Sequence, residues 1–141
     1  IKRIMSSGPI LTLPDYSLPF YIACDASDCA SGACLFHVID GIERPICYIS
    51  KKFLKYQRSY TVIEKECYAL LTAVLRFRIY FGSNPVVVYC DHDPLVYLHT
   101  RRDVSMKYVR WSLQLQEFNI IIKHRPGRDN LLPDILSRPS T

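Results

Sequence analysis

The pattern of apolar positions along the chain predicts five β-strands, each a short run of mostly apolar residues. These runs cover residues 20–24, 30–38, 44–50, 86–90 and 119–124. The runs at 20–24 and 86–90 are continuously apolar, which is typical of strands buried on both faces of a sheet. A turn at Asp40-Gly41 separates the second run from the third. Because the first three runs are close in sequence, we expect them to form an antiparallel meander.

Helical periodicity is strongest from Thr61 to Phe81, where apolar residues recur every three or four positions and define one face. Gly82 is expected to end this helix. Shorter helices are predicted at 94–100, 105–118 and 129–138. The fourth strand follows a helix and should therefore run parallel to the first. The predicted fold class is α/β, with a five-stranded mixed sheet (a three-strand antiparallel meander plus two parallel strands) flanked by helices.

The composition is that of one folded domain. The chain has 141 residues, of which 49% are hydrophobic and 22% charged, and chains of this length usually form a single core. These values exclude a disordered protein, and no apolar run approaches the ~20 residues needed to cross a bilayer. We expect an irregular segment at 1–18, a domain at 19–138 and a tail at 139–141. Since the chain lacks a starting Met and a signal peptide, we expect a piece of a longer protein.

The net charge and the cysteines give limited information about the partner and the cellular compartment of the protein. Eighteen Lys and Arg against thirteen Asp and Glu give a net charge of +5, which is compatible with a polyanionic partner, although many basic proteins have none. The six cysteines form no C-x-x-C pair, and several lie in apolar runs, where a free thiol packs as a small hydrophobe. We therefore expect a reduced intracellular protein without a zinc site.

Two of the predicted strands end in the same way, with one carboxylate directly after five apolar residues. Asp25 follows the first strand and Asp91 the fourth. If these strands are adjacent and parallel, the two carboxylates lie roughly 5 Å apart at one edge of the sheet and repel each other unless a cation lies between them. Paired Mg²⁺ ions about 3.5–4 Å apart would fit there. The alternative is that each aspartate only caps the element that follows it.

Two predicted helices offer further carboxylates. On the long helix, Glu66 lies about 60° from the centre of the apolar face and Glu64 about 100°, so we expect Glu66 to lean toward the sheet and Glu64 toward solvent. Glu66 also lies in an early turn, where the helix dipole tolerates a carboxylate. Asp134 follows Pro133 in the last predicted helix. On this reasoning alone, Glu66 could also be an ordinary boundary residue and Asp134 ordinary surface.

Five separated motifs occur along the chain. They are Cys24-Asp25-Ala26-Ser27-Asp28; Ser59-Tyr60-Thr61 with Glu64-Lys65-Glu66; Asp91-His92-Asp93-Pro94-Leu95; Arg110-Trp111 with Leu115-Gln116-Glu117-Phe118; and His124-Arg125-Pro126-Gly127-Arg128-Asp129-Asn130, followed by Asp134-Ile135-Leu136-Ser137-Arg138. Together they resemble the ribonuclease H domain of reverse transcriptases from gypsy-type LTR retrotransposons, over a span from about Ser7 to Arg138. The resemblance implies an RNase H-like fold, with residues 1–18 as the link from a preceding polymerase region.

The resemblance also implies an activity, the endonucleolytic hydrolysis of the RNA strand of RNA–DNA hybrids by a two-metal mechanism, within the reverse transcriptase (RNA-directed DNA polymerase) of a Pol polyprotein. The family's metal-binding set maps onto Asp25, Glu66, Asp91 and Asp134, which would hold two Mg²⁺ ions, with Mn²⁺ as a substitute. His124 falls where many RNases H have a mobile histidine implicated in proton transfer or product release. A surface histidine at a strand end is the alternative.

The implied partners are an RNA–DNA hybrid and the adjoining polymerase region, with no membrane and no small-molecule cofactor, and the implied location is a cytoplasmic retroelement particle. The chain departs from the family pattern at two places. Leu132-Pro133 precede the last aspartate, where the family usually has Val-Ala, and Ala30 stands where a glycine is often found. Neither change removes a ligand, although Pro133 could shift Asp134 and weaken one metal site.

Two basic clusters are candidates for contact with the phosphates of a hybrid, which is recognised by its shape. The first consists of Lys51, Lys52, Lys55 and Arg58, and the second of Arg101, Arg102, Lys107 and Arg110. Such clusters can equally be solvated faces, and Trp111, within the second, is expected in the core.

Two other functions are compatible with this fold. One is a catalytically inactive module that binds nucleic acid or scaffolds the polymerase. The other is an integrase-like strand-transfer domain. Such a domain should carry its glutamate on a late helix, whereas Glu66 lies between Asp25 and Asp91 in the sequence.

Overall fold

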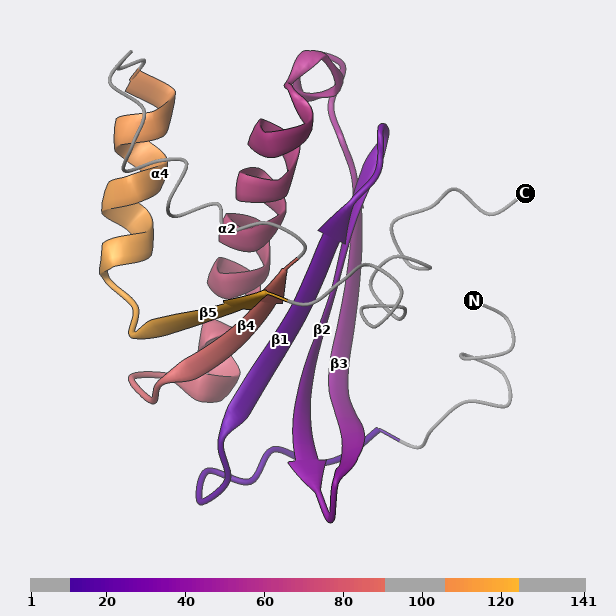
Figure 1. Ribbon diagram of the computed structural model, residues 1–141, viewed down its shortest axis with the longest axis vertical. Helices are drawn as coiled ribbons and strands as arrows, with labels where there is room; N and C mark the ends of the chain where they lie inside the picture. Colours follow the sequence, from indigo (N-terminus) through magenta and orange to yellow (C-terminus); the bar gives the residue numbers. More distant parts are fainter. Residues whose placement is uncertain (1–10, 91–105, 125–141) are drawn as a thin grey trace, which may run out of the picture.

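The computed structural model describes residues 11–90 and 106–124. In chain order, the elements are β1 (Phe20–Ala26), β2 (Ala30–Ile39), β3 (Ile42–Lys52), the 3₁₀-helix η1 (Gln57–Ser59), α2 (Val62–Phe81), β4 (Val86–Cys90), α4 (Met106–Gln116) and β5 (Ile120–His124). The strands form one sheet in the order β3-β2-β1-β4-β5 (Figure 1). β1, β2 and β3 pair antiparallel, and β4 pairs parallel with both β1 and β5. The predicted mixed sheet and its α/β class are therefore confirmed.

The antiparallel meander follows from its turns. Asp40 and Gly41 both have positive φ, at 55° and 76°, and they join the paired residues Ile39 and Ile42. Two positive φ angles in a two-residue loop are what a tight hairpin with the normal strand twist requires, and Asp-Gly is a preferred sequence for them. β1 is longer than predicted, because its pairing with β2 continues through Asp25. Asp25 therefore lies inside the strand and not beyond its end.

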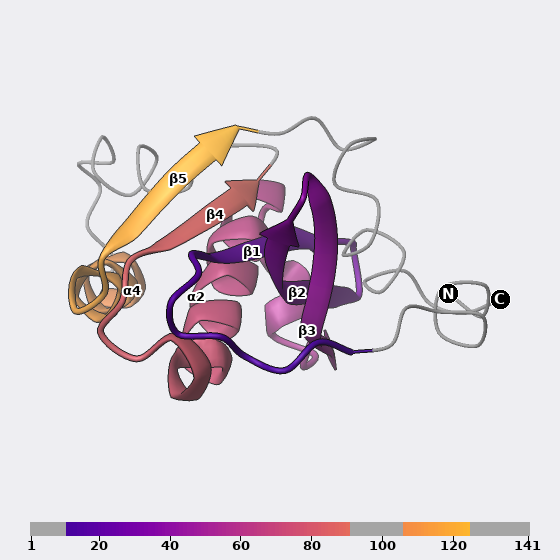
Figure 2. The same cartoon turned by 90° about the horizontal axis from the view of Figure 1, so that it is seen from below.

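The two described α-helices, α2 and α4, cover the same face of the sheet (Figure 2). On that face, the alternating β1 residues Phe20, Ile22 and Cys24 join the main core, to which α2 contributes Leu70 and Phe77. The other alternation of β1 faces the opposite side, where it forms a second cluster. This cluster contains Tyr21, Ala23, Cys34, Phe36, Tyr48 and Tyr89, and three of its rings stack at centroid distances of 5.5 to 6.4 Å.

The ends of α2 are fixed by local hydrogen bonds. Thr61 is the N-cap, so the helix begins at Val62, one residue later than predicted. Gly82, with φ at 59°, ends it and donates its N–H to the Arg78 carbonyl, as the sequence predicts. The predicted helix at 105–118 is observed as α4, and η1 was not predicted. The predicted helices at 94–100 and 129–138 lie outside the described residues.

Residues 11–19 form no helix or strand, and hydrogen bonds to the backbone of β3 and to the His37 side chain of β2 hold them against the sheet. The Thr12 N–H donates to the Pro45 carbonyl at 2.7 Å. The fully buried His37 donates from Nδ1 to the Pro19 carbonyl at 2.8 Å, while its Nε2 accepts from the Asp15 N–H at 3.0 Å. Since a backbone N–H can only donate, His37 is a neutral Nδ1–H tautomer. Within the described part of the chain, no helix is long and apolar enough to span a membrane.

Candidate active site

The carboxyl ends of β1 and β4 lie side by side, as predicted. Their parallel register pairs Ala23 with Tyr89, and the next residues along, Cys24 and Cys90, bring their Sγ atoms within 3.7 Å of each other in the core. Asp25 follows Cys24 in the sequence, and Asp91 follows Cys90. The strand adjacency behind the paired-carboxylate prediction is therefore present, whereas Asp91 itself lies outside the described residues.

Asp25 lies in the last part of β1 and is half-buried. Its partner on β2 is Gly32, so no side chain from that strand stands directly opposite the carboxylate. β1 and β4 point toward the end of the molecule at which α2 begins (Figure 1). The fold therefore brings Asp25 to the end of the sheet that also receives the first turns of α2.

Glu66 lies in the second turn of α2 and is half-buried, with its Oε2 atom buried. This agrees with the predicted lean toward the sheet. The prediction for Glu64 was wrong, because Glu64 is only 7% exposed. The helical-wheel argument ignored the side chain's own hydrogen bonds and the packing of α4 beside it.

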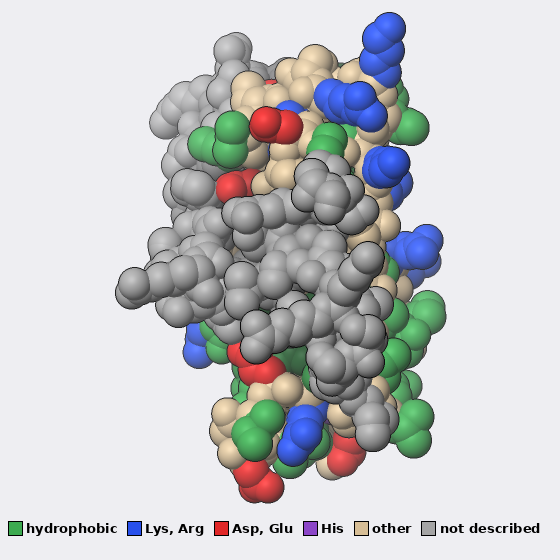
Figure 3. Space-filling view, turned by 90° about the vertical axis from the view of Figure 1, so that its right-hand side faces the viewer, with side chains coloured by type: hydrophobic (Ala, Val, Ile, Leu, Met, Phe, Trp, Pro, Cys, Tyr) green, Lys and Arg blue, Asp and Glu red, His purple; other side chains and the backbone are tan. Residues whose placement is uncertain are grey.

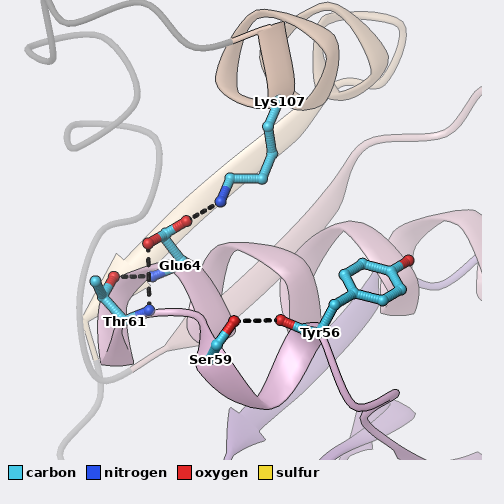
Figure 4. A network of polar contacts seen from close by, with 5 residues as sticks. All are labelled: Tyr56, Ser59, Thr61, Glu64 and Lys107. Atoms are coloured by element: carbon cyan, nitrogen blue, oxygen red, sulfur yellow. Dashed lines mark hydrogen bonds and ion pairs between the residues drawn. The ribbon is translucent and has the colours of Figure 1, made fainter.

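Glu64 is held by a network of polar contacts at the start of α2 (Figure 4). Its Oε1 accepts from the Thr61 N–H at 3.2 Å, its own N–H donates to Thr61 Oγ1 at 3.2 Å, and its Oε2 pairs with Lys107 of α4. Burial alone would raise the pKa of Glu64, but the hydrogen bonds from Lys107 and Thr61 outweigh it and hold that pKa below its usual value. Both oxygens of Glu64 therefore serve the protein's own structure.

The Lys107 ammonium also lies among aromatic rings. Nζ is 4.2 Å from the ring centroid of Tyr60, 5.3 Å from that of Tyr108 and 5.6 Å from that of Trp111, distances at which a cation is attracted to the ring face. Trp111 is 6% exposed and belongs to the core, as expected. The Lys107 ammonium is therefore paired with the Glu64 carboxylate and packed against aromatic rings. The sequence did not indicate this pairing.

The first basic cluster is exposed and close to Asp25. Lys51, Lys52, Lys55 and Arg58 are all exposed, at the end of β3 and in the loop that leads to α2. Ser31 of β2 pairs with both Ala26 and Lys51, so two strand spacings, about 10 Å, separate Lys51 from the end of β1. Figure 3, which views the β3 side, shows Lys and Arg side chains along the right-hand margin of the upper half.

The remaining predicted site residues are only partly described. In the second basic cluster, Arg110 is exposed on α4, while Arg101 and Arg102 lie outside the described residues. His124 is the last residue of β5 and pairs with Cys90, which places its backbone beside the end of β4. Asp134 also lies outside the described residues.

Three residues of this region have roles that the sequence reasoning missed. Thr61 and Glu64 form a reciprocal capping box, which the spacing Thr-x-x-Glu before an apolar helix could have indicated. Lys65 is 8% exposed and donates to the Asp28 carbonyl at 2.9 Å. No signal in the sequence separates Lys65 from a lysine on a solvated helix face.

The donor set fits magnesium in its chemistry. Asp25 and Glu66 supply carboxylate oxygens, the ligands that Mg²⁺ prefers, from a strand and a helix that pack against each other. The described residues contain no group of three or more His, Cys, Asp or Glu side chains placed to hold a metal ion. The predicted set can therefore be complete only with Asp91 and Asp134.

Comparisons with known proteins agree with the fold and the motifs. Residues 15–118 match the family described as the RNase H-like domain found in reverse transcriptase. The retrovirus-related Pol polyprotein from transposon opus of Drosophila melanogaster is 37% identical over 139 residues, which are 98% of this chain and 14% of that polyprotein. The chain thus spans about a seventh of this relative's length.

Solved structures share the fold. The foamy viral protease-reverse transcriptase in complex with an RNA/DNA hybrid superposes with a TM-score of 0.70 at 23% identity, over 93% of this chain and 18% of that one. LC11-RNase H1 in complex with an RNA/DNA hybrid superposes with a TM-score of 0.60 at 16% identity, over 83% of this chain and 92% of that one. The second match covers nearly the whole of a separate RNase H protein.

Proposed function

The chain belongs to the RNase H-like domains of reverse transcriptases, of the kind found in gypsy-type LTR retrotransposon Pol polyproteins, and we propose that it hydrolyses the RNA strand of RNA–DNA hybrids. The observation that carries this proposal is the parallel pairing of β1 with β4. It brings the end of β1, which contains Asp25, beside the end of β4, which Asp91 follows in the sequence, and α2 with Glu66 packs against β1. A module that had lost its activity would be expected to have lost some of the candidate ligands, whereas Asp25, Glu66, Asp91 and Asp134 are all present in the sequence.

In this proposal Asp25, Glu66, Asp91 and Asp134 hold two Mg²⁺ ions. When bound, such a pair activates a water for attack on the scissile phosphate and stabilises the leaving oxygen. Asp25 is presented by a strand paired on both sides, and Glu66 by a capped helix, so both carboxylates start from rigid elements. His124, whose backbone lies beside Cys90, would take part in proton transfer or product release.

The proposed substrate is consistent with the charge near the site. Lys51, Lys52, Lys55 and Arg58 are exposed at the end of β3 and in the segment that leads to α2, where they would contact phosphates of the bound hybrid. Two structural neighbours are solved with RNA/DNA hybrids, which supports the same substrate class here. The second proposed partner is the adjoining polymerase region of the same polyprotein, in a cytoplasmic retroelement particle.

A cleavage assay on a labelled RNA–DNA hybrid with Mg²⁺ tests the proposal, with the domain alone and joined to its upstream polymerase region. Asp25→Asn should lower the cleavage rate at least about 1,000-fold, because the carboxylate charge that holds the metal is lost. Its melting temperature should stay the same or rise, since repulsion between carboxylates is relieved.

The matched control for this assay is Asp40→Asn, in the exposed hairpin turn. An asparagine also tolerates the positive φ of that position, so full activity is expected. The proposal would be refuted if purified wild-type protein failed to cleave the hybrid both as the domain alone and when joined to its polymerase region. It would also be refuted if the Asp25→Asn variant were active.

A further inference from the structure

Lys65 is a charged residue in a buried place. It lies in the first turns of α2 with 8% exposure, and lysine is rarely buried unless it is paired. Its Nζ donates to the Asp28 carbonyl at 2.9 Å and lies 5.9 Å from the ring centroid of Phe53. Burying an ammonium is costly unless a partner compensates for the lost water, so these contacts fix where the side chain goes.

The carbonyl that receives this hydrogen bond belongs to an ordered turn between β1 and β2. The Ser27 N–H donates to the Ala30 carbonyl at 2.8 Å, and the Ala30 N–H donates to Ser27 Oγ at 3.2 Å. The Phe53 N–H, from the residue after β3, donates to the Cys29 carbonyl at 2.8 Å. A turn held by three such bonds moves as a unit, so the contact from Lys65 fixes the whole turn relative to α2.

This contact joins the two segments that carry the described carboxylates. Asp28 comes three residues after Asp25, and Lys65 comes directly before Glu66. We propose, on the basis of the nuclease function proposed above, that Lys65 is a positioning residue of the metal site. Its ammonium holds the β1–β2 turn against α2, so that the Asp25 and Glu66 carboxylates reach the same ion.

The position and the charge of Lys65 have opposite effects on Mg²⁺ binding. The ammonium is a positive charge near the site, and removing the charge alone would strengthen the binding of a cation. Removing the hydrogen bond from Lys65 to the Asp28 carbonyl lets the Asp25 and Glu66 carboxylates move apart, which weakens Mg²⁺ binding. Lys65→Met keeps an unbranched side chain to pack against Phe53 and removes the donor, so the sign of the change in Mg²⁺ affinity separates the two roles.

The test is a Mg²⁺ titration without nucleic acid, by calorimetry or by NMR of the amide signals. Lys65→Met should bind Mg²⁺ about 10-fold more weakly than the wild type, the size found for outer partners of metal ligands. The matched control is Lys107→Met, which removes another ammonium that contacts the first turn of α2, through Glu64. The control should bind Mg²⁺ as tightly as the wild type or more tightly.

An affinity of Lys65→Met equal to or above that of the wild type would overturn the positioning role. A wild type that binds no Mg²⁺ would instead refute the nuclease function on which the role rests.

A measurement on the wild type keeps the inference testable should Lys65→Met fail to fold. If the hydrogen bond from Lys65 to the Asp28 carbonyl favours Mg²⁺ binding, then Mg²⁺ binding must stabilise that hydrogen bond to the same degree. Saturating Mg²⁺ should therefore slow hydrogen exchange at the Ala30 and Phe53 amides, which donate within and onto the turn, by several fold. Exchange rates that Mg²⁺ leaves unchanged at both amides would contradict the role of Lys65.

Discussion

The ion pair between Glu64 and Lys107 ties α4 to the start of α2, and its removal gives a quantitative prediction. Glu64→Gln keeps the capping box, because glutamine also serves at this position of the motif, and removes only the charge. Glu64→Ala removes the capping bond as well. Comparing the two variants therefore separates the contribution of the Glu64 charge from that of its capping hydrogen bond.

The expected cost follows from exposure. The Glu64 side chain is 9% exposed and that of Lys107 is 31% exposed, so the pair lies between a surface and a buried ion pair. We expect Glu64→Gln to lower the free energy of unfolding by about 1 kcal/mol. Glu64→Ala should lower it by about 2 kcal/mol, because the lost capping bond contributes about 1 kcal/mol more.

Urea denaturation at pH 7 of the wild type, Glu64→Gln, Lys107→Met and the double variant measures the coupling between the two residues, which should be about 1 kcal/mol. The pKa of Glu64 in the folded protein is lowered from 4.5. The stabilisation is therefore present above pH 4.5 and is lost as the pH falls through the folded-state pKa. The wild type and Glu64→Gln should converge in stability below that pH.

A coupling near zero at pH 7 would refute this account of Lys107. The same conclusion would follow if Lys107→Met left stability unchanged but lowered the affinity for a hybrid and reduced its salt dependence by about one ion, which is the signature of a phosphate contact.

Two further predictions concern the second cluster of the sheet and the first basic cluster. Tyr48 Oη is buried without a hydrogen-bond partner among the described residues, so Tyr48→Phe should raise the free energy of unfolding by about 1 kcal/mol in chemical denaturation. Burial raises the pKa of Tyr48 to about 12, so the wild type should lose stability between pH 10 and 12, and the variant should lose less; equal losses would contradict this. Changing Lys52 and Lys55 to Met should weaken hybrid binding and reduce the slope of log affinity against log salt by about two. The control, Lys123→Met at an exposed position, should leave the affinity and the slope unchanged. An unaltered slope in the double variant would exclude phosphate contacts by Lys52 and Lys55.

Local patterns were sufficient for most of the sheet. The apolar runs before Asp25 and Asp91 indicate strands buried on both faces, and such strands pair in the middle of a sheet, where β1 and β4 are found. Asp40 and Gly41 indicate a turn because few other residues adopt positive φ. These features depend on residues close together in the sequence, which is why the sequence predicts them.

Contacts between distant residues could not be predicted in this way. Lys107 lies 43 residues from Glu64 and Lys65 lies 37 residues from Asp28, and no periodicity relates either pair. The helical wheel placed Glu64 toward solvent because it treats a side chain as fixed to its own helix, whereas α4 and the capping box decide its burial. Candidate ligands follow from spacing, but the residues that hold them in place depend on the tertiary fold.

The central claim is that Asp25 and Glu66 bind the same divalent ion, and anomalous diffraction from crystals soaked in Mn²⁺ tests it most directly. The account predicts an anomalous peak within about 2.2 Å of one oxygen of each carboxylate, close to the distances at which hard cations bind such ligands. The peak should be absent from crystals of Asp25→Asn. A peak elsewhere on the protein, with none between these two carboxylates, would contradict the claim.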